Sequence, residues 1–274
     1  MDQALSRSYA GDFVAWNGGC LLIGSGAGVI APHSHYAIQL ALGAPDGLRV
    51  QFGRGGAWQA CCAALIPSRA THTIDVFDCQ WSAVIFIEPE TPEGRALSLR
   101  LNGSLEVLDT AAAQVAARRL ERAWRTEKSP DAVRSVCLQW VRELSDTAPR
   151  EPSDPRILRA VEVIRARMDQ PTSLEDIARS VHLSPSRFRH LFVEQTGMAL
   201  RTYMLWRRLL HVWELLMEGE TLSGAAHLAG FADSAHLSRT AKTMFGLAPS
   251  LLRMTGPLST RIRARSTSAE PAGQ

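Results

Sequence analysis

One segment of the chain occurs twice. The first copy begins at Ser173 and reads SLEDIARSVHLSPSRFRHLFVEQTG, and the second begins at Thr221 with TLSGAAHLAGF. The aligned positions are Ser173 with Thr221, Leu174 with Leu222, Ala178 with Ala226, Leu183 with Phe231 and, after one extra residue in the second copy, Phe188 with Leu237, Phe192 with Ala241 and Gly197 with Gly246. A repeat of this kind predicts two similar structural units in one region of the chain.

Each copy has the pattern of a helix, a short turn and a second helix. In the first copy Ser173 is a helix N-cap, and Ser184 followed by Pro185 begins the next helix. On that next helix, the spacing of Phe188 and Phe192 places both side chains on the inward face. A helix pair of this form is typical of the helix-turn-helix, whose second helix enters the major groove of DNA.

The outward face of this second helix carries polar and positive side chains. They are Ser186, Arg187, Arg189 and His190. Arginine and histidine on one exposed helix are residue types that contact phosphates and base edges. The first copy alone therefore predicts a surface that binds DNA.

A long helix is predicted between the copies, from ALRTYMLWRRLLHVWELLMEG. Such a helix would hold the two outer helices about 34 Å apart, the distance between successive major grooves on one face of a duplex. Basic residues outnumber acidic ones in residues 154–254, whereas acidic residues predominate in residues 1–100. The positive charge therefore lies in the region that is expected to meet a polyanion.

The order of elements and the residues at matching positions resemble the AraC/XylS family of bacterial transcription regulators. LEDIARSVHLSPSRFRHLFVEQTGMALRTYMLWRRL matches the first motif of the family almost throughout. GFADSAHLSRTAKTMFGLAPSLLR matches its C-terminal signature at Gly230, Phe231, Ser238, Arg239, Lys242, Phe245, Gly246, Pro249 and Arg253. The resemblance covers residues 157–254 and implies a sequence-specific DNA-binding regulator, with no catalytic activity and no cofactor.

The resemblance also implies roles for individual residues. The base-reading residues would be Ser186, Arg189 and His190 in the first copy, and Ser234, Ala235 and Arg239 in the second. Arg187, His236 and Lys242 complete the predicted DNA-binding set. Arg239 suits guanine or a phosphate, whereas Ala235 offers only apolar contact, for example with a thymine methyl group. For Arg239 the alternative is a solvated surface charge. Histidine is an uncommon base reader, so a structural role is the alternative for His190.

The N-terminal part predicts a different fold class. From Asp12 to Pro89, short apolar runs such as CLLIGS, YAIQLAL, HTIDVF and SAVIFI are separated by Gly, Pro and Asp. Many short strands at this spacing are typical of a small antiparallel barrel or sandwich. Beyond Pro92, DTAAAQVAARRLERAW and SPDAVRSVCLQWVRELS predict two helices. We therefore predict a multidomain protein, with an all-β barrel, a helical connector and an all-α domain.

Two histidine motifs lie within the predicted strands. HSHYAIQ contains His33, His35 and Gln39, and PSRATH contains His72. The spacing resembles the two cupin motifs, in which histidines and a glutamate converge on a metal inside a β-barrel. Residues two apart on a strand share a face, so His33 and His35 are expected to point into the barrel together.

The match to the cupin motifs is incomplete. Gln39 stands where a glutamate ligand is usual, and Arg69 stands where a glycine is usual. An amide oxygen is a poor ligand for zinc or iron beside a carboxylate. We therefore predict that His33, His35, Gln39 and His72 bind a small-molecule effector and no metal. Histidines with a purely structural role and a true metal site are the alternatives.

The chain divides into four predicted regions. Residues 1–100 form a cupin-like effector-sensing domain, residues 101–150 a helical connector, residues 154–254 the AraC-type DNA-binding domain, and residues 255–274 a disordered basic tail. TAPREPSDP, at residues 147–155, is the predicted linker because it is rich in proline. The resemblance implies that the connector helices dimerise the protein, and the alternative is that their apolar side chains simply cover the barrel.

The sequence predicts a cytoplasmic protein. No run is long and apolar enough for a membrane span, and MDQALSRSYAGDF has neither the basic start nor the apolar stretch of a signal peptide. The 5 cysteines lack metal-binding spacing and are expected to be free thiols. A redox role for Cys61, Cys62 and Cys79 is the alternative.

Together these patterns predict a one-component transcription regulator. Its expected partners are double-stranded DNA, a small-molecule effector, a second copy of the chain and, if it activates transcription, RNA polymerase. A thiol- or metal-responsive regulator, or a cupin-type metalloenzyme fused to a DNA-binding domain, would also account for parts of the pattern.

Overall fold

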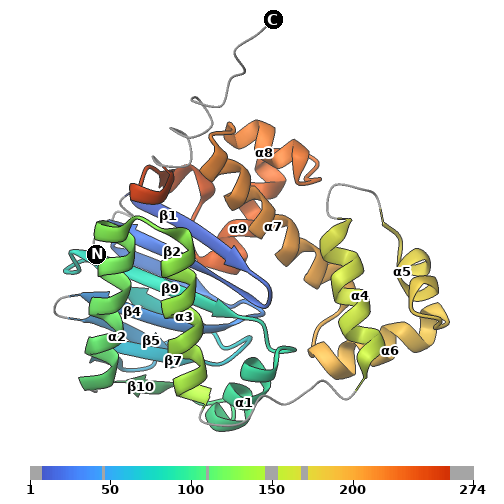
Figure 1. The fold of residues 1–274 in the computed structure, drawn as a ribbon, viewed down its shortest axis with the longest axis horizontal. Helices are drawn as coiled ribbons and strands as arrows, with labels where there is room; N and C mark the ends of the chain where they lie inside the picture. Colours follow the sequence, from blue (N-terminus) through green and yellow to red (C-terminus); the bar gives the residue numbers. More distant parts are fainter. Residues whose placement is uncertain (1–7, 45–46, 109–110, 146–153, 168–171, 260–274) are drawn as a thin grey trace, which may run out of the picture.

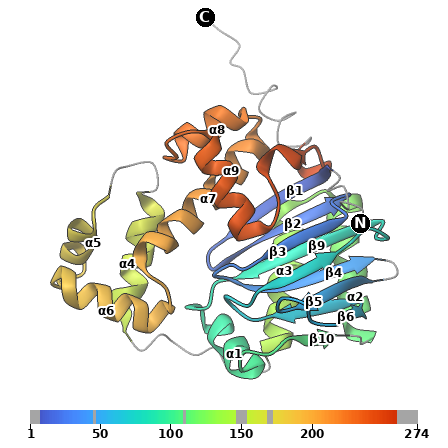
Figure 2. The same cartoon turned by 180° about the vertical axis from the view of Figure 1, so that it is seen from behind.

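The computed structural model describes residues 8–44, 47–108, 111–145, 154–167 and 172–259. Its strands form two facing sheets, and two long helices cover the outer side of one sheet (Figure 1). A second group of helices stands beside the sheets (Figures 1 and 2). The predicted fold class, a β-rich region followed by a helical region with helix-turn-helix units, is confirmed.

The two sheets are built from short strands. The larger sheet has the order β10-β7-β4-β9-β2-β1-β11, and the smaller sheet has the order β3-β8-β5-β6. The strands are β1 Tyr9–Trp16, β2 Gly19–Ser25, β3 Val29–His33, β4 Ile38–Ala44, β5 Leu48–Phe52, β6 Trp58–Cys61, β7 Ala63–Ile66, β8 His72–Asp75, β9 Trp81–Ile87, β10 Glu106–Leu108 and β11 Leu252–Met254. Neighbouring strands are antiparallel, except that β11 runs parallel to β1.

Three helices follow the main strands: α1 (Pro92–Leu101), α2 (Ala111–Glu121) and α3 (Pro130–Ser145). A π-helical segment, Arg122–Glu127, continues α2. α2 and α3 are the two helices expected from the sequence, and they lie across the outer face of the larger sheet (Figure 1). The sequence did not predict α1 or β10. Because β10 pairs with β7, the region expected to be a connector also contributes a strand to the sheet.

The larger sheet is buried on both faces. Ala41 on β4 pairs with Ala64 on β7 and with Val84 on β9. Ala41 and Ala64 share a buried cluster with Val50 and Ile74 of the smaller sheet, so this face forms the interior between the sheets. Residues at alternate positions pack with α2 and α3 instead. Burial on both faces explains why these strands read as nearly continuous apolar runs.

The C-terminal helices are α4 Pro155–Ala166, α5 Leu174–Ser180, α6 Pro185–Thr196, α7 Leu200–Glu218, α8 Leu222–Leu228 and α9 Ser234–Phe245, followed by a 3-10 turn at Pro249–Leu251. α7 is the predicted long helix. Its 19 residues span roughly 28 Å and join the α5–α6 pair to the α8–α9 pair (Figure 2). The predicted linker at residues 147–155 falls almost entirely outside the described residues.

The two helix pairs repeat each other in detail. Both turns contain one residue with left-handed backbone, His182 with φ 55° and Gly230 with φ 75°. After each turn one amide closes back onto the preceding helix: Leu183 N donates to Ala178 O at 2.9 Å, and Phe231 N donates to Ala226 O at 2.9 Å. The second helices end at Gly197 and Gly246, both left-handed C-caps. The predicted repeat is therefore a repeat of backbone geometry.

The chain returns to the sheet after the last helix. β11 pairs with the first strand, with Tyr9 opposite Leu252. Beyond it, the buried carboxylate of Asp12 accepts hydrogen bonds from Leu258 N at 3.1 Å, Ser259 N at 2.8 Å and Trp124 Nε1 at 2.7 Å. The prediction of a disordered tail from residue 255 is wrong for residues 255–259, because these donors hold the segment against the two facing sheets, which are called the barrel below. Residues 260–274 lie outside the described residues.

Among the described residues, none of the helices has the length and apolarity needed to cross a membrane.

We predict that Asp12→Ala destabilises the protein by about 2 to 4 kcal/mol, because it leaves buried N–H donors without an acceptor. Denaturant unfolding followed by circular dichroism measures this change. Asp78→Ala, which removes an exposed carboxylate, should shift the free energy of unfolding by less than about 0.5 kcal/mol. Equal effects of the two substitutions would contradict the role assigned to Asp12.

Candidate nucleic-acid interface and barrel cavity

The second helix of each pair presents a polar face to solvent. Ser184 caps α6 by accepting a hydrogen bond from Arg187 N at 3.3 Å, and Asp233 caps α9 by accepting from His236 N at 2.6 Å. Phe188 and Phe192 are buried beneath α6, as the sequence predicted. The predicted DNA-binding residues that are exposed are Ser186, Arg187, Arg189, His190, Ser234, Ala235, Arg239 and Lys242, and His236 is half-buried.

The four cations on these faces stand apart from the ion pairs of the molecule. Across the described part of the chain, no ion pair involves Arg187, Arg189, Arg239 or Lys242. Elsewhere most of the ion-paired arginines lie on the barrel side or on α2–α5. Cations outside ion pairs on an exposed helix are available to contact phosphates or guanine edges.

The two predicted histidines make contacts within their own units. His190 Nδ1 lies 2.9 Å from the carbonyl oxygen of Ser186, one helical turn earlier. The His236 ring packs edge-on against Phe231, with 5.3 Å between the ring centroids. These contacts occupy part of each ring, so arginine is the stronger candidate for base reading on both helices.

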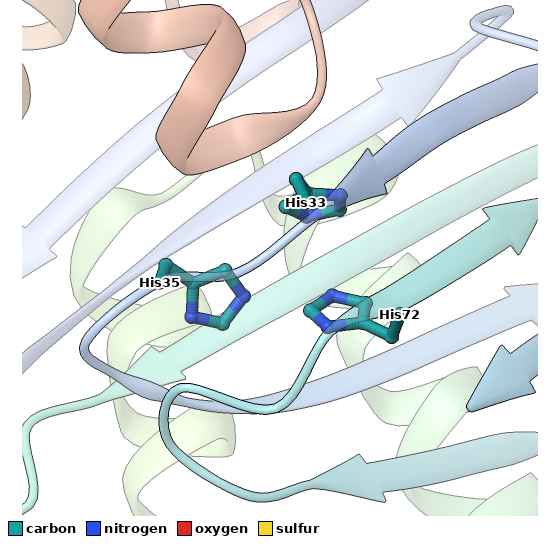
Figure 3. Close-up of side chains that lie close together, drawn as sticks. All are labelled: His33, His35 and His72. Carbon is teal, nitrogen blue, oxygen red and sulfur yellow. The ribbon is translucent and has the colours of Figure 1, made fainter. Parts of the chain in front are cut away.

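Three buried histidines meet where the two sheets face each other (Figure 3). His33 ends β3 and pairs with His72 at the start of β8, and His35 follows in the next loop. One ring nitrogen from each of the three lies within 4.8 Å of those of the others. The structure thus brings together the residues of the two sequence motifs.

Hydrogen-bond acceptors surround the histidine cluster. Each Nδ1 faces a backbone carbonyl: Ala31 at 2.8 Å from His33, Ala37 at 2.8 Å from His35 and Ala70 at 2.9 Å from His72. The Gln39 side-chain oxygen lies 2.6 Å from His35 Nε2 and 3.3 Å from His72 Nε2. A neutral imidazole carries only one N–H, so it cannot donate to oxygen atoms at both nitrogens.

The histidines are neutral at physiological pH. Burial lowers the pKa of His33 to about 4 and, with the nearby His33, the pKa of His35 to about 3. Burial, with His35 and His33, also lowers the pKa of His72 well below its usual value. A neutral cluster retains the nitrogen lone pairs that a metal or a donor group of a ligand requires.

A small cavity lies beside the histidines, between the sheets. Its free volume is about 40 Å³, and it is lined by Tyr9, Leu22, Ile30, His33, Gln39, Ala41, Leu42, Leu48, Ile74, Val76, Ser82, Ala83, Val84, Phe86, Phe245, Leu247 and Leu252. His33 and Gln39 are therefore the predicted effector residues that reach this cavity. His35 instead borders a groove of about 380 Å³ between the barrel and the C-terminal helices, and His72 lines neither space.

The C-terminal helices close one side of the cavity through aromatic contacts. Phe245, at the end of α9, packs edge-on against Phe86 of β9 with 5.2 Å between centroids and is stacked on Trp206 of α7 at 5.4 Å. Trp206 also contacts Phe86 at 5.5 Å. The sequence did not predict this contact, because Phe245 has the spacing of an ordinary core position of its helix.

A buried ion cluster joins the same two halves. Glu88, which follows β9, is fully buried and pairs with Arg165 of α4 and, at 3.0 Å, with Arg207 of α7. Burial alone would raise the pKa of Glu88, but the two guanidinium charges outweigh it and hold the pKa below its usual value. The one sequence signal was an acidic residue directly after the apolar run SAVIFI.

A second buried carboxyl group lies next to this cluster. The Tyr36 hydroxyl donates to Glu90, and Tyr36 in turn packs edge-on against Tyr203 of α7. Burial and the neighbouring charge of Glu88 raise the pKa of Glu90 to about 8. Glu90 is therefore largely protonated at neutral pH.

Comparison with known proteins identifies the helical region. Residues 177–255 match the family model described as a helix-turn-helix domain. Together with the repeated units, this match shows that the C-terminal region is a helix-turn-helix domain of the AraC type.

Two curated relatives match part of this chain. The uncharacterized HTH-type transcriptional regulator YidL of Escherichia coli is 28% identical over 132 residues, which cover 44% of each chain. The HTH-type transcriptional activator RhaR of Pectobacterium atrosepticum is 35% identical over 91 residues, 33% of this chain and 32% of the relative. This chain therefore spans less than half the length of the curated relatives that it matches.

Solved structures of ToxT from Vibrio cholerae have a similar overall fold. A ligand-free variant gives a TM-score of 0.55 at 11% identity, over 89% of this chain and 96% of that chain. ToxT bound to (E)-4-(8-methylnaphthalen-1-yl)but-3-enoic acid gives a TM-score of 0.53 at 12% identity, over 89% and 97%. The similarity extends the shared fold from the helical region to the β region.

We predict that the free energy of unfolding falls as the pH rises from 6.5 to 8 and that Glu90→Gln removes most of this fall. The folded-state pKa of Glu90 is raised, so unfolding releases a proton in this range and becomes easier at higher pH. The buried histidines change stability mainly below pH 6.5 and in the opposite direction. Denaturant unfolding at several pH values measures the slope.

The exposed carboxyl of Glu220 provides the control for this prediction. Glu220→Gln removes a carboxyl group that makes no buried contact among the described residues, and it should keep the wild-type slope. A wild-type slope in Glu90→Gln would contradict the raised pKa.

Proposed function

We propose that the protein is a one-component transcription regulator that binds DNA through α6 and α9 and responds to a small molecule in the barrel cavity. The observation that carries this proposal is the pair of helices with exposed cations, held by one chain that also encloses a cavity between its sheets. It acts in the cytoplasm, and catalysis forms no part of the proposed role.

The DNA-binding half of the proposal rests on α6 and α9. The roughly 28 Å length of α7 is close to the rise of one DNA turn, so the two helices suit successive major grooves. Arg189 and Arg239 are proposed to read bases or hold phosphates, with the remaining predicted residues of each helix around them. A dimer formed through α2 and α3 would place two such domains on adjacent half-sites. RNA polymerase is a partner if the regulator activates transcription.

The chemistry of the cavity determines the kind of effector. Its lining is mainly apolar, with polar groups from Tyr9, His33, Gln39 and Ser82. Such a lining suits a small, mostly apolar molecule with one or two polar groups. The ToxT structures hold an unsaturated fatty acid or a naphthalenyl butenoic acid, so small carboxylic acids are the first compounds to screen. Typical coupling between such sites is about 1 to 3 kcal/mol.

A metal-responsive regulator is the second candidate function. In His33, His35 and His72 the Nδ1 atoms face backbone carbonyls, which is how metal-bound histidines are commonly oriented, with Nε2 toward the metal. Two of these Nε2 atoms face the Gln39 oxygen, and a cation between them would relieve the contact between acceptors. Rotation of the Gln39 amide, which would point its NH2 group at the rings, relieves the same contact without a metal.

A thiol-based redox switch and a metalloenzyme have less support. Cys61 is buried, and Cys62 and Cys79 are half-buried. No geometry among the described residues favours either function over an effector-controlled regulator.

We predict that Arg189→Ala and Arg239→Ala each weaken binding to a selected operator by about 1 to 3 kcal/mol if the arginine reads a base. If it holds only a phosphate, the slope of binding against salt concentration should fall by about one counterion. Genomic DNA fragments selected on the purified protein supply the operator, and fluorescence anisotropy at several salt concentrations measures both quantities. Arg54→Ala, which removes an exposed arginine far along the chain from α6 and α9, is the matched control.

Two outcomes would contradict this part of the proposal. The first is unchanged affinity in both arginine variants. The second is failure of the wild-type protein to enrich any duplex over random DNA.

We predict that zinc stays at well below one equivalent in the purified protein after incubation and dialysis, as expected for an effector cavity. Mass spectrometry of the metal content measures it. One bound equivalent that is lost in His72→Ala, and retained in the exposed control His227→Ala, would instead establish the metal-responsive candidate.

A further inference from the structure

We infer that the C-terminal end of α9 and an effector compete for the barrel cavity, so that effector binding releases the second helix-turn-helix unit from the barrel. This inference rests on the proposed function, because it concerns regulation through the same cavity. It assigns to residues 245–247 the role of an internal ligand of the barrel.

Residues 245–247 occupy the barrel as a ligand would. Leu247 belongs to the buried cluster of the barrel interior, together with Ile30, Ala41 and Ile74. Phe245 lines the same cavity and contacts Phe86. Leu247 comes from the DNA-binding domain, whereas the other buried members of its cluster come from the barrel.

Gly246 fits closely between these two side chains. A Cβ atom added to it would lie 2.7 Å from Ala31 O, from His33 Nδ1 and from Ile30 Cγ2. The backbone of the α9 end is therefore pressed onto β3 and onto one histidine of the cluster. Figure 3 shows this helix end next to His33.

The size of the cavity makes the two states exclusive. A water molecule needs about 10 to 15 Å³ of such free volume, so the 40 Å³ present here holds only a few waters. An effector of even ten heavy atoms does not fit while Phe245 and Leu247 remain in place. The walls on the other sides are hydrogen-bonded strands, so the helix end is the part that can withdraw at the lowest cost.

Withdrawal would change the second unit more than the first. The DNA-facing residues of α9 are exposed in the docked state, so docking fixes the orientation of this helix and does not cover it. The equivalent C-cap of α6, Gly197, faces only the flexible guanidinium of Arg69, 2.8 Å from an added Cβ. The effector would therefore alter the position of α9 relative to α6.

The two C-cap glycines provide a matched test. Gly246→Ala and Gly197→Ala place alanine in the same left-handed backbone, with φ 68° and 73°, so the intrinsic penalty is the same. Only Gly246→Ala collides with barrel backbone. Hydrogen exchange should increase in residues 29–33 and 234–254 of Gly246→Ala, and only around the α6–α7 turn of Gly197→Ala.

Indole, an aromatic molecule with one N–H donor, serves as the ligand probe in calorimetry. When the α9 end has left the cavity, a ligand can enter without first displacing it. Gly246→Ala should therefore bind indole about tenfold or more tightly than wild type. Gly197→Ala should match wild type. Leu247→Ala removes one of the side chains that fill the cavity and adds no backbone strain. It should also bind indole more tightly than wild type, so the test remains valid if Gly246→Ala misfolds.

Equal indole affinity in all four proteins, including no binding in any, would overturn the inference. Retained operator binding by the wild-type protein would then leave the proposed function intact. Failure of operator selection, by contrast, would overturn the proposed function whatever the indole result.

Discussion

The buried carboxylate of Glu88 determines how the two halves of the protein fit together. A charge removed from water is costly unless it is paired, and both of its guanidinium partners, Arg165 and Arg207, come from the C-terminal helices. The geometry is therefore specified, because other placements of these helices would leave Glu88 unpaired. Such a buried ion pair adds little net attraction between the two halves, because each charged group regains its hydration when the pair separates. The cluster thus fixes one orientation and still permits the halves to part.

The two helix-turn-helix units share a backbone but not an environment. The first closes its core with Phe192, whereas the second has Ala241 at the matching position. In the second unit Phe245 packs against Trp213 at 5.8 Å and against Phe86 of the barrel. The second unit therefore obtains from the barrel and from α7 apolar contacts that its small residues do not supply. β11 and Asp12 hold the same end of the chain, so this unit is attached to the barrel beyond its helices as well as before them.

The sequence predicted features whose signals are local. Helix caps, the repeated turn and the alternation of short apolar runs depend on residues close together in the chain, and these predictions are confirmed in α5 to α9 and in the sheets. The contacts of Asp12 with Ser259 and of Phe86 with Phe245 join residues far apart in the sequence. An aspartate or a phenylalanine does not indicate in the sequence which distant residue it will contact. β10 and β11, each with 3 residues, are too short to show a strand period. Which histidines share a site was predictable, because two motifs pointed into one barrel, whereas the helix end beside them was not.

The contact between His33 and Gly246 links the two candidate signals. His33 lines the cavity, belongs to the histidine cluster and lies against the α9 backbone. A metal would orient its ring, and an effector would displace the helix end beside it, so either signal acts on the same few atoms. Gly246 has no side chain that could move aside, so a small movement of the His33 ring must shift α9 as a whole. Under the proposed competition, the glycine that ends α9 is therefore also the point at which the barrel acts on that helix.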